Sequence, residues 1–120
     1  MASIREYELT VHEPSKGTAV IEINPNVGTW SPFIVAIPAD EMKLINPSIM
    51  YGPAKTVPAP GVIEGSRSNL SRDSKWWLLS AADKATPTQS YYIFCKKLPS
   101  TIIFGVNGGK PQYKHIFAKQ

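Results

Sequence analysis

The chain has 120 residues, a length at which one domain with one hydrophobic core is expected. Hydrophobic residues make up 42% of it and charged residues 18%, a composition too apolar for an intrinsically disordered chain. Its eleven prolines disfavour a helical bundle, because a proline costs a helix interior about 3 kcal/mol. We therefore expect a single β-rich domain over residues 1–120.

Cysteine content and hydropathy bear on the cellular compartment. Cys95 is the single cysteine, so a disulfide framework within one chain is excluded. Residues 1–6 lack the apolar core of a secretory signal, and no apolar stretch approaches the ~20 residues of a membrane-spanning helix. We expect a cytoplasmic protein without membrane insertion, in which Cys95 is a small buried hydrophobe and not a nucleophile.

The first third of the chain predicts two paired strands, one buried strand and a short helix. Apolar and polar residues alternate over residues 4–11, and a turn separates them from the β-prone residues 18–23, which predicts a hairpin. Residues 30–38 are continuously apolar and predict a strand buried on both faces. Residues 39–46 predict one helical segment, with Asp40 as its N-cap and Asn46 at its end.

The remainder predicts a long connection followed by four strands. Residues 48–65 are rich in proline and glycine and show little periodicity, which indicates an irregular loop. Residues 76–79 and 90–97 have strand composition, and a hairpin is the simplest way to connect them. The last two apolar segments flank an Asn107-Gly108 pair, which predicts a terminal hairpin.

Together these segments predict an all-β fold. Seven or eight short strands at spacings of roughly ten residues, with at most one short helix, are typical of a β-sandwich or a small barrel. A β-trefoil is the alternative, because the length divides into three units of about forty residues. We expect one core that includes Trp30, Val35, Ile37, Leu79, Ile93, Ile103 and Ile116.

Patterns that indicate catalysis or metal binding are weak. The two histidines, His12 and His115, lie far apart in the sequence, and one cysteine provides no zinc-ligand spacing. Glu6 and Glu8 fall on one face of the first strand, but alternate glutamates are typical of a solvated strand face. The sequence thus predicts a protein that is not an enzyme and that carries no metal or cofactor.

Charge and aromatic residues are concentrated in the second half. Residues 61–120 contain nine basic and three acidic residues, whereas residues 1–60 contain four and six. Adjacent strand residues face opposite ways, so one residue of the Trp76-Trp77 pair and one of the Tyr91-Tyr92 pair should point away from a buried face. Exposed aromatic side chains are enriched where proteins bind ligands.

These features predict a non-catalytic binding module for a protein or carbohydrate ligand, of a lectin-like or inhibitor-like kind. We expect the ligand on the loop 52–65, the polar segment 66–75 and the aromatic pair that follows, with binding residues Arg67, Arg72, Lys75, Trp76 and Trp77. The terminal hairpin around Lys110, Tyr113 and Lys114 is the second candidate.

Two alternative functions remain open. Interleaved basic and aromatic side chains are also typical of single-stranded nucleic-acid binding. The other alternative is an oligomer, a self-assembling structural protein of the viral or phage type.

Overall fold

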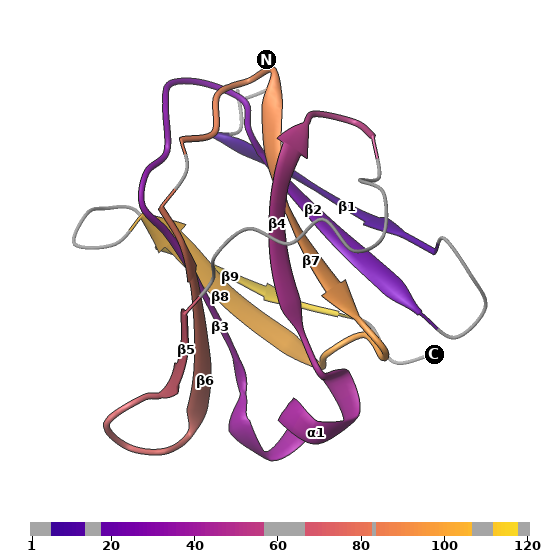
Figure 1. Ribbon diagram of the computed structural model, residues 1–120, viewed down its shortest axis with the longest axis vertical. Helices are drawn as coiled ribbons and strands as arrows, with labels where there is room; N and C mark the ends of the chain where they lie inside the picture. The colour runs from indigo at the N-terminus through magenta and orange to yellow at the C-terminus, as the bar shows by residue number, and fades with distance from the viewer. Residues whose placement is uncertain (1–5, 14–17, 57–66, 83, 107–111, 118–120) are drawn as a thin grey trace.

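The computed structural model describes residues 6–13, 18–56, 67–82, 84–106 and 112–117 (Figure 1). Two antiparallel sheets face each other, with strand orders β1-β2-β7-β4 and β5-β6-β3-β8-β9. The described residues form the strands β1 (Tyr7–His12), β2 (Ala19–Pro25), β3 (Phe33–Pro38), β4 (Ser48–Pro53), β5 (Arg67–Leu70), β6 (Trp76–Ala81), β7 (Gln89–Cys95), β8 (Thr101–Val106) and β9 (Gln112–Ile116). The predicted β-sandwich is confirmed, and the two-layer arrangement differs from the trefoil alternative.

Two of the three predicted hairpin pairings are present. Strand β1 pairs with β2, and β8 pairs with β9, both antiparallel. The Asn107-Gly108 turn lies outside the described residues. The predicted pairing of β6 with β7 is wrong, because β6 pairs with β3 and β5 whereas β7 pairs with β2 and β4. The β2–β3 and β6–β7 connections both cross from one sheet to the other. Backbone hydrogen bonds between Trp30 and Ala85 join these two connections.

Strands β4 and β5 arise in segments for which the sequence predicted no strand. Residues 48–53 were expected to be irregular, yet Ser48–Pro53 pairs along its length with β7. Proline at the end of an edge strand is tolerated because no second neighbour needs its missing N–H. Residues 57–65 of the predicted loop lie outside the described residues.

The predicted helical segment is present as a 3-10 turn, η1 (Ala39–Glu41), followed by α1 (Met42–Ile45). It ends as expected at Asn46, whose φ of 42° lies in the left-handed region. The predicted cap at Asp40 is wrong, since neither helix start in this described segment has a side-chain cap. Instead the neighbouring Glu41 carboxylate accepts hydrogen bonds from the Ser100 N–H and hydroxyl, at 3.0 and 2.5 Å.

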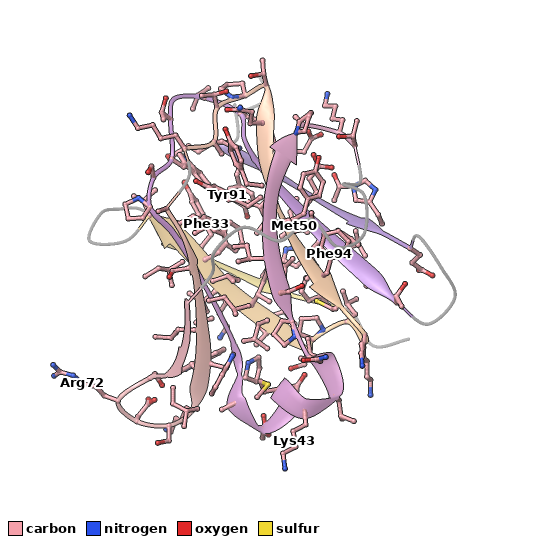
Figure 2. The ribbon with its side chains drawn as sticks, in the orientation of Figure 1. Phe33, Lys43, Met50, Arg72, Tyr91 and Phe94 are labelled. Atoms are coloured by element: carbon pink, nitrogen blue, oxygen red, sulfur yellow. The ribbon has the colours of Figure 1, made fainter. Side chains whose placement is uncertain are left out.

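The core lies between the two sheets. At its centre the rings of Phe33 and Tyr91 stack at 4.1 Å with an interplanar angle of 8° (Figure 2). Both side chains are fully buried. The predicted core members Trp30, Val35, Ile37, Leu79 and Ile93 are all buried as expected.

Two predicted core residues lie on the other side of their strands. Ile116 is 70% exposed, and Ile103 is only half-buried. In β8 the alternate residues Ile102 and Phe104 contribute to the core, and in β9 Tyr113 packs against it. The predictions for Ile103 and Ile116 are therefore wrong, because the strand alternation turns both side chains outward.

Cys95 is buried, and burial raises the pKa of its thiol to about 12. Because the thiolate is the reactive form, we expect the native protein to react slowly with a disulfide reagent such as Ellman's reagent at pH 8 and the urea-denatured protein to react rapidly. Cys95→Ser should leave binding per folded molecule unchanged. Rapid stoichiometric labelling of the native thiol would contradict this assignment.

Candidate functional site

The β5–β6 hairpin carries most of the residues predicted to bind a ligand. Its turn is built by Asp73, whose carboxylate accepts hydrogen bonds from the Ser71 hydroxyl at 2.6 Å and the Lys75 N–H at 3.0 Å. These hydrogen bonds hold the pKa of Asp73 below its usual value, and the one from the Ser71 hydroxyl has the larger effect. Arg72 and Lys75 are exposed, and Arg72 extends from the tip of the hairpin (Figure 2).

The two tryptophans of β6 face opposite sides of their sheet. Trp77 packs against the core between the sheets, whereas its neighbour Trp76 is half-buried on the outer side. The prediction that one of the pair points away from the core is confirmed. The structure thus places Arg72, Lys75 and Trp76 on one hairpin and turns Trp77 inward. Arg67 belongs to β5, where its backbone pairs with Ser80.

The tyrosines of β7 also face opposite sides of their sheet, as predicted, but neither is exposed, since both Tyr91 and Tyr92 are fully buried. Tyr91 belongs to the core, and Tyr92 belongs to a second apolar cluster with Val20 and Met50. In Figure 2, Met50 and Phe94 lie on the side of the four-stranded sheet that faces away from Phe33 and Tyr91. The outer face of this sheet is therefore buried around Val20, Met50 and Tyr92, although Glu8 on the edge strand β1 is exposed.

The outer side of the five-stranded sheet forms a mainly apolar surface, which we call the open face. The register places Leu78 opposite Ala36, Ala36 opposite Ile103, and Ile103 opposite Lys114, in one row across β6, β3, β8 and β9. We define the open face by the described outward side chains of β3, β6, β8 and β9, which are Ile34, Ala36, Pro38, Trp76, Leu78, Ser80, Thr101, Ile103, Lys114 and Ile116.

The open face is partly exposed to solvent, unlike the inner side of the same strands. In β3 the inward residues Phe33, Val35 and Ile37 are fully buried, whereas of the outward residues Ala36 is buried but Ile34 and Pro38 are only half-buried. The prediction that this strand is buried on both faces is therefore wrong for Ile34 and Pro38. Contiguous exposed apolar surface on a folded domain marks an interaction site.

A polar cluster around Glu22 lies in the buried part of the outer face of the four-stranded sheet. Glu22 is 3% exposed, and its Oε2 accepts hydrogen bonds from the Ser90 hydroxyl at 2.8 Å, the Lys55 N–H at 2.5 Å and the Tyr92 hydroxyl at 3.1 Å. His12 Nε2 lies 2.8 Å from Oε1. Sequence analysis did not single out Glu22, although a lone carboxylate inside the apolar run 19–23 was a signal for it.

The Glu22 carboxylate is stabilised in its charged form. Burial raises its pKa, but the donors from Lys55, His12, Ser90 and Tyr92 together outweigh that effect and hold the pKa below its ordinary value. The Ser90 hydroxyl donates to Glu22 and not to His12, so the hydroxyl and the imidazole are not arranged as a nucleophile and its base.

The Glu22 cluster fastens the turn after β4 to the sheet. Besides the Lys55 contact, the Thr56 N–H donates to the Tyr92 hydroxyl at 3.1 Å, and the Ala54 N–H donates to the Thr88 carbonyl at 3.0 Å. The described part of the predicted ligand loop, residues 52–56, is thus attached to the four-stranded sheet. Trp76 belongs to the other sheet.

Comparison with known protein families, characterised proteins and solved structures finds no match for this chain. Among the described residues, no helix is long and apolar enough to cross a membrane. No group of three or more His, Cys, Asp or Glu side chains in the described part of the chain is arranged to hold a metal ion.

Proposed function

We propose that this β-sandwich is a non-catalytic binding module that docks a protein partner on the open face. The observation that carries the proposal is the position of Trp76, which is half-buried beside Leu78 and Pro38 instead of in the core. A large aromatic side chain in a flat apolar surface is typical of the centre of a protein interface.

The composition of the open face favours a protein over a carbohydrate ligand. Sugars are bound by several hydrogen-bonding side chains beside an aromatic ring, whereas Ser80, Thr101 and Lys114 are the polar side chains among the outward positions that define the face. Nucleic acid binding would use cations along a groove. Among the outward side chains that define the open face, Lys114 is the one cation, and Arg72 and Lys75 lie in the turn of the β5–β6 hairpin, which we call the hairpin end of the face.

Replacing Trp76 with alanine is the experiment that tests the docking face. We expect Trp76→Ala to weaken partner retention about 30-fold, because truncating an aromatic interface anchor costs about 2 kcal/mol or more. The measurement is quantitative mass spectrometry of proteins retained on immobilised wild-type and variant chains. Each variant is first shown to be folded by its thermal transition.

Leu44→Ala provides the matched control, because Leu44 is 61% exposed on α1 and does not belong to the open face. It should retain the same proteins as the wild type. If the Trp76→Ala chain retained the partner and the Leu44→Ala chain did not, the binding surface would lie elsewhere.

A further inference from the structure

Among the outward side chains that define the open face, Lys114 is the charged one. Lys114 is exposed, and the register places it directly opposite the apolar Ile103. No carboxylate occurs among the outward positions that define the face. A single cation within apolar surface is desolvated when a partner covers the surface, which is costly unless the partner supplies an anion.

The hairpin end of the open face is also cationic. Lys75 directly precedes Trp76, and Arg72 is exposed in the same turn. The one carboxylate of this turn, Asp73, already accepts hydrogen bonds from the Ser71 hydroxyl and the Lys75 N–H. Arg72 forms no ion pair with another residue in the described part of the chain, so its guanidinium can pair with a partner's carboxylate.

Acidic residues of the described strands belong to the other sheet. Glu8 lies on β1, and Glu22 lies on β2 with its oxygens already hydrogen-bonded. Two open faces brought together would oppose cations with cations, which disfavours a symmetric pairing of two copies through this surface. Charge complementarity points to a different, acidic partner.

We infer that the open face docks an acidic protein segment, one whose apolar side chains cover Trp76, Leu78 and Ile103 while its Asp or Glu residues pair with Lys114 and the hairpin end. The inference rests on the proposed function, so its test separates the two. The probe is a displayed library of random peptides, selected on the immobilised full chain and on its variants.

Wild-type chain should enrich peptides that combine apolar residues with net negative charge. On Lys114→Glu, affinity for these peptides should fall about tenfold or more, and fresh selection should yield more basic sequences. Lys43→Glu is the matched control, because it makes the same charge change at an exposed position on α1 (Figure 2) and should keep the acidic preference.

The outcomes distinguish the charge inference from the docking face. Apolar peptides without acidic preference, lost on Trp76→Ala, would overturn the charge inference and leave the docking face intact. Peptides that bind Trp76→Ala as tightly as wild type would overturn the docking face, and no enrichment over a blank support would count against both. If the chain bound phosphatidylserine vesicles and the selection enriched no acidic peptide, the inferred protein partner would be wrong and the ligand would be an anionic membrane.

Discussion

Glu22→Ala is expected to lower the free energy of unfolding by about 3 to 5 kcal/mol. The change removes the acceptor of the buried Ser90 hydroxyl and of the partly buried hydrogen bond from the Lys55 N–H, and a buried donor left without an acceptor costs about 1 to 3 kcal/mol. Urea denaturation at neutral pH measures the loss. Glu8→Ala is the control on the adjoining strand, where the exposed side chain predicts a change within about 0.5 kcal/mol.

The same carboxylate makes stability depend on pH. The pKa of Glu22 is lower in the folded protein than its ordinary value of 4.5, so its ionised form favours folding. This contribution is fully present above the unfolded pKa and is lost as the pH falls through the folded pKa. The wild type should therefore lose stability in this acidic range more steeply than Glu22→Ala. Parallel pH profiles, or a variant as stable as the wild type at neutral pH, would contradict the role of Glu22.

Phe33→Ala is expected to lower the free energy of unfolding by about 3 to 5 kcal/mol. Phe33 is fully buried between the sheets and stacks on Tyr91, so its removal leaves a cavity and exposes the face of that ring. The difference in the free energy of unfolding is obtained from the denaturant midpoints of variant and wild type, provided that both unfold with the same dependence on denaturant concentration. Ile116→Ala on the open face should change stability by less than about 0.5 kcal/mol, and an equal loss in both variants would refute the assignment of inner and outer faces.

The sequence predicts where strands lie along the chain far better than it predicts which strands pair. Alternation and turn residues identified β1 and β2 and their hairpin, because both signals are local. The residues of β4 and β5 follow no clear period, so these strands are defined by their pairing with β7 and β6. The partner of β6 was missed because the nearest following strand lies in the other sheet.

The candidate site shows the same division between local and distant information. Alternation predicted that one of Trp76 and Trp77 faces outward, but two adjacent tryptophans give no sign of which one. Ile102 and Ile103 present the same ambiguity, and only packing against the opposite sheet decides it. The Glu22 cluster depends on Lys55 and Ser90, which are 33 and 68 residues away in sequence.

Photo-crosslinking from the open face tests most directly whether this surface docks a protein. Ile116 and Leu44 are comparably exposed, at 70% and 61%, so p-benzoylphenylalanine placed at either position meets solvent to a similar degree. Irradiation in cell lysate should give a discrete protein adduct from position 116 and none from position 44. An adduct from position 44 with none from position 116 would contradict a docking role for the open face.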